Sequence, residues 1–169
     1  MPKQPGIDAD ELEIRIAAES DLESLAESFA HGTSAAQLQR RLEESKCGLR
    51  TMLLADLEGR AVGAVSIGGW GHQREGSLRL FALDVGPAFQ CKGVGTALIK
   101  AVEAIAADRD LDEVNLEVEI DNDDAIRLYR RLGYRICGDP VMDRWQLMND
   151  DGSSETVEVP VFVMVKRLV

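Results

Sequence analysis

The segment "QCKGVGTALIK", from Gln90 to Lys100, joins a glycine loop to the start of an apolar stretch with helical spacing. Free backbone N–H groups and the positive end of the dipole let a helix N-terminus bind anions such as phosphate. Gly93 and Gly95 carry no Cβ, so the backbone there can approach a ligand closely. The glycine spacing matches neither a dinucleotide-binding turn nor a P-loop. The loop is therefore a candidate phosphate site, and a tight turn that binds nothing is the alternative.

A second group of candidate residues follows this helix. The segment "VNLEVEI", residues 114–120, alternates apolar and polar residues, which predicts a strand with Glu117 and Glu119 on its polar face. The next segment, "DNDDAIRLYRRLGY", predicts a helix capped by Asn122, with Tyr129 on its apolar side. A carboxylate and a phenol can act as general base and general acid, so this segment could carry catalysis.

The rest of the chain supplies the elements that must position these residues. Strand patterns cover residues 12–17, 51–57, 61–67, 77–85, 143–148 and 157–168. Two helices are predicted after the first strand, with Ser20–Glu23 and Ser34–Gln37 as capping boxes. This order predicts a single α/β (α+β) domain.

With elements in that order, "LDVGPAFQCKGVGTAL" and "LEVEIDNDDAIRLYRRLGY" resemble the GNAT family of N-acetyltransferases. The first segment matches the family loop Gln/Arg-x-x-Gly-x-Gly/Ala, and the second matches L-x-V-x-x-x-N followed by A-x-x-L-Y-x-x-x-G-[FY]. The spacing from Glu117 to Tyr129 is most similar to that of ribosomal-protein alanine N-acetyltransferases. The element order fits nearly the whole chain, while the motif identities cover residues 83–134.

The resemblance implies a mixed, mostly antiparallel sheet flanked by helices, and acetyl-CoA as cosubstrate; no metal is expected, because the histidines and cysteines form no metal-binding pattern. The loop would hold the pyrophosphate through backbone N–H groups, and the strand before it would pair its main chain with the pantetheine arm. Asn122 would bond the same arm. The implied cofactor-binding residues are Leu83, Asp84, Val85, Gln90, Cys91, Lys92, Gly93, Val94, Gly95, Thr96 and Asn122.

Transfer of an acetyl group to an amine by direct attack needs a base for the amine proton and an acid for the departing thiolate. We expect Glu117 to be the base and Tyr129 the acid. Asp84 and Glu119 are the alternative bases, and Asp84 departs from the small or apolar residue that is usual in the family. The alternative interpretation of these two residues is that neither is catalytic. Glu117 would then be a solvated surface residue, and Tyr129 would be an aromatic residue of the core.

Composition limits the partners. The net charge of −11 and the pI of about 4.6 disfavour nucleic acid and anionic membranes, and they are compatible with a cationic acceptor. The acceptor is expected to be a primary amine on a small cationic molecule or on a peptide. Because no apolar stretch approaches the ~18 residues of a membrane span and the N-terminus lacks a signal-peptide core, a cytoplasmic protein is expected. Residues 1–10 are predicted to be a loose leader and residues 11–169 the N-acetyltransferase domain.

The three cysteines and two histidines show no disulfide or metal spacing. Trp70, in a glycine-containing loop, is a candidate acceptor contact. Homodimers are frequent in the resembled family, which implies one here. Two rival functions are a non-catalytic acyl-CoA sensor or regulatory module of the same fold and a phosphate- or nucleotide-binding protein without transferase activity.

Overall fold

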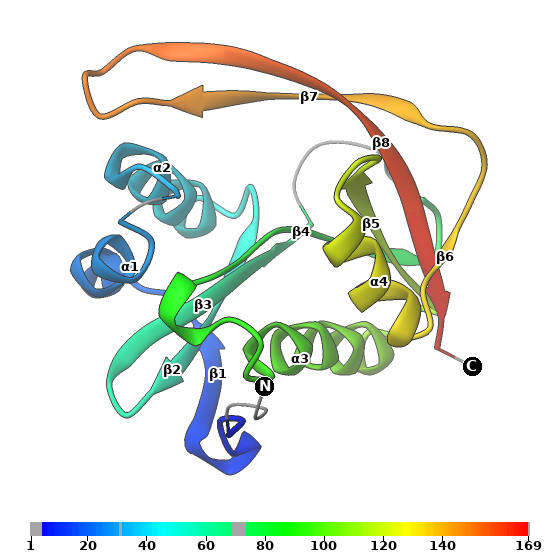
Figure 1. The fold of residues 1–169 in the computed structure, drawn as a ribbon, viewed down its shortest axis with the longest axis horizontal. Helices are drawn as coiled ribbons and strands as arrows, with labels where there is room; N and C mark the ends of the chain where they lie inside the picture. Colours follow the sequence, from blue (N-terminus) through cyan, green and yellow to red (C-terminus); the bar gives the residue numbers. More distant parts are fainter. Residues whose placement is uncertain (1–4, 31, 69–73, 169) are drawn as a thin grey trace.

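The computed structural model describes residues 5–30, 32–68 and 74–168 (Figure 1). The strands are β1 (Leu12–Ile16), β2 (Thr51–Leu57), β3 (Arg60–Ile67), β4 (Ser77–Val85), β5 (Glu113–Glu119), β6 (Arg135–Ile136), β7 (Val141–Met148) and β8 (Ser154–Arg167). The α-helices are α1 (Leu22–Ser28), α2 (Ala35–Lys46), α3 (Val94–Asp108) and α4 (Asp123–Arg131). Short 3₁₀ turns cover Ala9–Glu11, Glu19–Asp21 and Pro87–Phe89.

The strands form one sheet in the order β1-β2-β3-β4-β5-β8-β6, and β7 pairs with the outer part of β8. All neighbours are antiparallel except β4 and β5, which run parallel and pair over Ser77–Arg79. The predicted fold, an α/β domain with a mixed and mostly antiparallel sheet, is confirmed. The short pairing of β4 with β5 lets the two strands separate toward their C-terminal ends (Figure 1).

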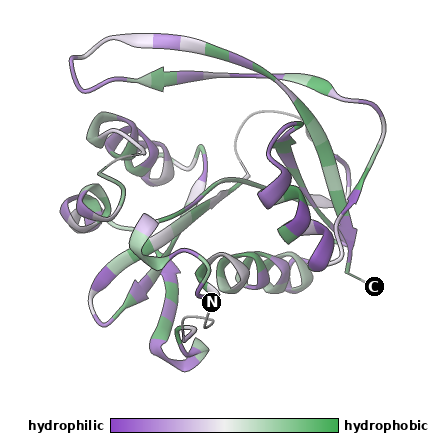
Figure 2. Ribbon diagram, in the orientation of Figure 1, coloured by the Kyte–Doolittle hydropathy of each residue, from purple (hydrophilic) through white to green (hydrophobic). Residues whose placement is uncertain are grey.

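Helices cover both faces of the sheet, and the strand period of two assigns side chains to them. Leu53 and Ala55 of β2 belong to the core under α3, while Met52 and Leu54 belong to the core under α1 and α2. Figure 2 shows α3 alternating between hydrophobic and hydrophilic segments, as expected of a helix with one buried face. A Cβ at Gly63 in β3 would lie 2.8 Å from Val94 Cγ1, so this glycine allows α3 to pack close to the sheet.

The helix caps are partly as predicted. Ser34 Oγ accepts the Gln37 N–H at 3.1 Å, but the Gln37 side chain instead accepts the N–H of Met148 at 2.9 Å. The predicted Ser20–Glu23 box is wrong, because the Asp21 carboxylate takes that place and accepts the Ala18 N–H at 2.8 Å. Asp21 is also held by Arg15, at 2.7 Å, which a local pattern cannot reveal.

The β7–β8 hairpin extends beyond the rest of the sheet and passes over α2 (Figure 1). Two side chains of α2 hold its far end, since Ser34 Oγ donates to the Met148 carbonyl at 2.5 Å and Gln37 accepts from its N–H. The strand β6 was not predicted, because two residues give no alternation to detect. The hairpin and α2 together form one wall of the cleft described below.

Candidate active site

The glycine loop between β4 and α3 has the geometry of an anion-binding turn. Gly93 is the N-cap of α3 with φ +94°, and Cys91 also has a left-handed φ of +59°. Gln90 Nε2 donates to the Val85 carbonyl at 3.1 Å, which ties the loop to the end of β4. The N–H groups of the first turn of α3 have no helical acceptor and, with the dipole, favour an anion there.

The N-terminal segment braces this loop. The Ile7 N–H donates to the Lys92 carbonyl at 3.1 Å, and the Ile7 side chain packs against the main core. This contact lies between the two left-handed residues of the loop and fixes the peptide that joins them. The domain boundary expected at residue 11 stays a prediction, while residues near Ile7 contact the domain.

A Cβ added at Gly93 would meet no heavy atom of the described chain within 4 Å. It would project into open space at the helix start, where a phosphate would lie, and a β-branched residue would also be strained at φ +94°. We expect Gly93→Val to weaken CoA binding roughly tenfold or more, because the added side chain would occupy the space of the phosphate, and a loss of about 1.4 kcal/mol is tenfold in Kd. Isothermal titration calorimetry with CoA measures this change.

Gly152, in the turn between β7 and β8, provides a matched control. It has φ +84° and equally open surroundings, so Gly152→Val carries the same backbone strain away from the loop. Gly93→Asn separates the two causes, because asparagine tolerates a left-handed φ but still adds a Cβ. Unchanged CoA affinity in a folded Gly93→Val protein would remove the loop from the cosubstrate site.

A cleft of about 1930 Å³ opens where β4 and β5 separate. Leu83, Asp84 and Val85 of β4 line it, together with the glycine loop, α4, α2 and β7. Ala82 has φ +50°, and the register of β4 against β3 shifts nearby, so β4 is irregular beside the cleft. The cleft is larger than the ~300–1,000 Å³ of an ordinary ligand pocket, which leaves room for a cosubstrate and an acceptor.

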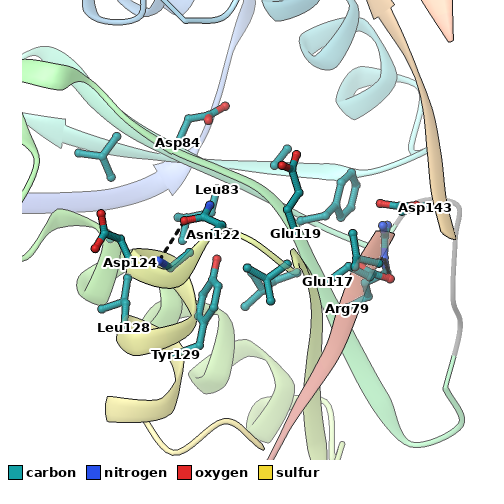
Figure 3. Close-up of a pocket in the computed structure, with 18 of the residues that line it drawn as sticks. Arg79, Leu83, Asp84, Glu117, Glu119, Asn122, Asp124, Leu128, Tyr129 and Asp143 are labelled. Carbon is teal, nitrogen blue, oxygen red and sulfur yellow. Dashed lines mark hydrogen bonds and ion pairs between the residues drawn. The ribbon is translucent and has the colours of Figure 1, made fainter. Parts of the chain in front are cut away.

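Tyr129 points its hydroxyl from α4 into the space between β4 and β5 (Figure 3). Its ring packs edge-to-face with Tyr134 at 6.0 Å between centroids, which fixes its orientation. The hydroxyl makes no hydrogen bond within the described part of the chain. Burial, and then the charge of Asp84, raise the pKa of Tyr129 to about 12. Tyr129 therefore carries its proton at neutral pH and can offer it to a ligand.

Glu117 lies in the cleft wall but is engaged in an ion pair. Both of its carboxylate oxygens lie 3.0 Å from Arg79 Nε, and the side chains of Glu117 and Arg79 are only 4% and 9% exposed. The strand face expected to be polar is thus largely buried, and Asn115 is fully buried, with Ser77 Oγ donating to its Oδ1 at 2.7 Å. Glu119 is exposed and turns its carboxylate toward the same cleft (Figure 3).

Asp84 is held by α2 across the cleft. Arg41 Nη1 donates to its carboxylate at 2.8 Å, and the Asp84 side chain remains 36% exposed. Asn122 lines the cleft and accepts the Ala125 N–H at 3.2 Å through Oδ1, which is the predicted cap. Cys91 is an exposed free thiol, as are Cys47 and Cys137.

The cleft also contains arginines that local sequence patterns did not reveal. Arg79 pairs with Glu117, Arg41 with Asp84, and both Arg40 and Arg50 with Glu44. Only a family alignment or the three-dimensional contacts could have identified them, since the partners of Arg41 and Arg79 lie about forty residues away. His31, Trp70 and His72 lie outside the described residues. Within the described ranges, no cluster of histidine, cysteine or carboxylate side chains could hold a metal ion.

The family profile described as "Acetyltransferase (GNAT) family" matches residues 16–134, more than half of the chain. The chain belongs to this family. Mycothiol acetyltransferase of Clavibacter michiganensis subsp. michiganensis is 38% identical over 84 residues, which is 50% of this chain and 26% of that protein. The chain thus spans about a quarter of the length of that relative.

Solved acetyltransferase structures share the fold. The ribosomal-protein-S18-alanine N-acetyltransferase of Escherichia coli has a TM-score of 0.66 at 18% identity, over 93% of this chain and 94% of that one. The PaiA N-acetyltransferase of Thermoplasma acidophilum, solved with coenzyme A, has a TM-score of 0.62 at 18% identity, over 92% and 98%. The predicted resemblance to the GNAT family is confirmed, and ribosomal-protein alanine N-acetyltransferases are among its structural neighbours.

The residues of the cleft fit acetyl-CoA, the cosubstrate of the family. The loop offers open space above a left-handed glycine, together with the free N–H groups of the α3 start, where a pyrophosphate can bind. The irregular edge of β4 at Leu83–Val85 lines the cleft beside it, and Asn122 lies opposite on α4.

Among the described residues, none of the helices has the length and apolar character that a membrane span requires.

Proposed function

We propose that the protein transfers an acetyl group from acetyl-CoA to a primary amine by direct attack, as a cytoplasmic enzyme. The observation that carries this proposal is Tyr129, whose protonated hydroxyl has no hydrogen-bond partner among the described residues and lines the same cleft as the anion-binding loop. A binding module has no need of a phenol placed in this way. The acetylated amine is formed as the new C–N bond replaces the C–S bond, and the thiolate leaves.

In this proposal Tyr129 donates a hydrogen bond to the sulfur that leaves. Because its pKa of about 12 is well above the ~8.5 of a typical thiol, full transfer of the proton is unfavourable. The phenol therefore stabilises the developing thiolate mainly as a donor, in a site where burial strengthens that bond. Asp84 adds to the raised pKa, and Arg41 offsets part of its charge.

We propose that the amine proton leaves through water to a carboxylate of β5. Glu117 remains the predicted base, and its ion pair with Arg79 holds the carboxylate in one orientation. Accepting a proton would weaken that pair, so Glu119, which is exposed and lies two residues along the same face, is its main rival. Asp84 is the second rival. It ranks below Glu119 because its carboxylate is already paired with Arg41. Expected homodimerisation stays a prediction.

The experiment that tests the proposal measures thiol release from acetyl-CoA with a panel of amines, amino acids, polyamines and peptides. Thiol release that depends on the amine, with the acetylated product identified by mass spectrometry, is the expected result. Tight CoA binding without turnover on any amine would favour the acyl-CoA sensor. Displacement of CoA by ATP or NAD at similar concentrations would favour a general nucleotide-binding protein.

The raised pKa of Tyr129 gives a testable pH dependence. The protonated phenol is the active form and persists below its folded pKa of about 12. We therefore expect kcat to show no descending limb near pH 10, where an ordinary tyrosine would lose its proton. A kcat profile from pH 6 to 10.5, with CoA and amine saturating, tests this. A fall with an apparent pKa near 10 that is absent in Tyr129→Phe would contradict it.

A further inference from the structure

Three arginines gather at the α2 end of the cleft: Arg40 and Arg41 in the helix, and Arg50 just before β2. Glu44 pairs with both Arg40 Nε, at 2.9 Å, and Arg50 Nη2, at 2.5 Å. Asp84 pairs with Arg41 at 2.8 Å. In the described part of the chain, these three guanidinium groups thus share two carboxylates. We call Arg40, Arg41 and Arg50 the arginine cluster, and it carries one positive charge more than its partners offset.

The members of the arginine cluster are close enough to repel one another. Burial lowers the pKa of Arg50, Glu44 opposes this, and the charges of Arg41 and Arg40 lower it further. Arg41 Nε is buried and has no hydrogen-bond partner. The cluster therefore contains like charges close to one another, and an additional anion beside it would relieve their repulsion.

Arg40 is the member that a ligand can reach. Its side chain is 40% exposed, whereas Arg41 and Arg50 are each 14% exposed. Only Nε of Arg40 is used by Glu44, so its two terminal nitrogens have no partner among the described residues. A guanidinium with two free nitrogens in one plane matches the two oxygens of a carboxylate.

Carboxylates line the part of the cleft near β5. Glu119 of β5 lies there, and Asp143 of β7 lies close to Glu117 and Arg79 (Figure 3). Neither Glu119 nor Asp143 has an ion pair in the described ranges, whereas Glu117 pairs with Arg79. Free carboxylates there suit the ammonium form of an incoming amine. The net charge of −11 does not reveal this distribution of charge in the cleft, because it is a sum over the whole chain.

We propose that the acceptor is an amine that also carries a carboxylate, and that the carboxylate binds the arginine cluster through Arg40. This inference rests on the proposed function and narrows its acceptor to an amino-acid-like or peptide-like zwitterion. One surplus positive charge matches a monoanion such as a carboxylate and is a poorer match for a phosphate. The exposed apolar side chains of Leu49 and Trp145, which also line the cleft, can contact the rest of such an acceptor.

The test compares acceptors in matched pairs. Amino acids and dipeptides, each beside its own amide, are assayed for kcat and KM by thiol release, with phosphoethanolamine as a phosphate-bearing amine. We expect the carboxylate member of a pair to be preferred roughly tenfold to a hundredfold in kcat/KM, the usual value of a charged hydrogen bond. Arg40→Gln should collapse that ratio toward one, chiefly through KM of the carboxylate, and Arg40→Lys should restore part of it.

Arg109→Gln is the matched control, because it removes the same charge from the exposed C-terminal end of α3, outside the cleft lining. It should leave both the ratio and the rate unchanged. Equal kinetics for carboxylates and amides, a ratio that survives Arg40→Gln, or a preference for phosphoethanolamine would each overturn the inference alone. No turnover with any amine, while CoA still binds, would instead overturn the proposed function on which it rests.

Discussion

Replacement of Tyr129 by phenylalanine should lower kcat on the order of 10²-fold while leaving the CoA Kd within about twofold. The substitution removes only the hydroxyl, which has no hydrogen-bond partner within the described chain. The ring keeps its packing against Tyr134, so no cavity forms and no buried group loses a partner. Stopped-flow or steady-state thiol release, with calorimetry for CoA, measures both quantities.

Tyr134→Phe is the control for this variant. Tyr134 is a buried tyrosine of the same core, and its hydroxyl donates to Glu103 Oε1 at 3.1 Å, away from the cleft. Loss of that bond should cost about 1–2 kcal/mol of stability, with kcat unchanged. If Tyr129→Phe kept the wild-type kcat, Tyr129 would be a packing residue and the departing thiolate would need another donor.

Glu117→Gln is expected to have two separate effects. It removes the Glu117 carboxylate from its buried ion pair with Arg79, and breaking a buried ion pair typically costs about 3 kcal/mol of unfolding free energy. If Glu117 is also the base, kcat at neutral pH should fall about 10²-fold, because glutamine accepts no proton. That deficit should shrink as pH rises toward the pKa of the amine, since more substrate arrives neutral. Urea unfolding and a kcat–pH profile measure the two effects.

A double variant separates the structural role of Glu117 from the chemical one. Glu117→Gln with Arg79→Met removes both charges, and an apolar replacement of a buried pair is often neutral for stability. We expect it to regain stability but not rate. Recovery of the rate as well would mean that Glu117 only supports Arg79. Glu119→Gln and Asp84→Asn complete the set, and whichever shows the pH-dependent loss in place of Glu117→Gln identifies the base.

Most helices and strands could be predicted from the sequence. The glycine loop, the strand of residues 77–85 and the helices that follow the loop and Asn122 were predicted from glycine placement, apolar periodicity and capping residues. These signals are local, because a cap or an amphipathic stripe acts within a few residues. The family motifs lie in the same segment, so the fold and the cosubstrate loop could be predicted together.

The sequence by itself determined the elements other than the two-residue strand β6, their order and the candidate residues, whereas the tertiary structure decided what each candidate contacts. Alternation in "VNLEVEI" predicted a polar face with Glu117 on it, but Arg79 of the neighbouring strand β4 pairs with Glu117, and both side chains are buried. Arg41 meets Asp84 in the same way, from a helix on another part of the chain. Such pairs depend on strand order and helix placement, which join residues that no local pattern relates. The charge of the cleft is therefore a property of the folded chain, and the overall composition does not show it.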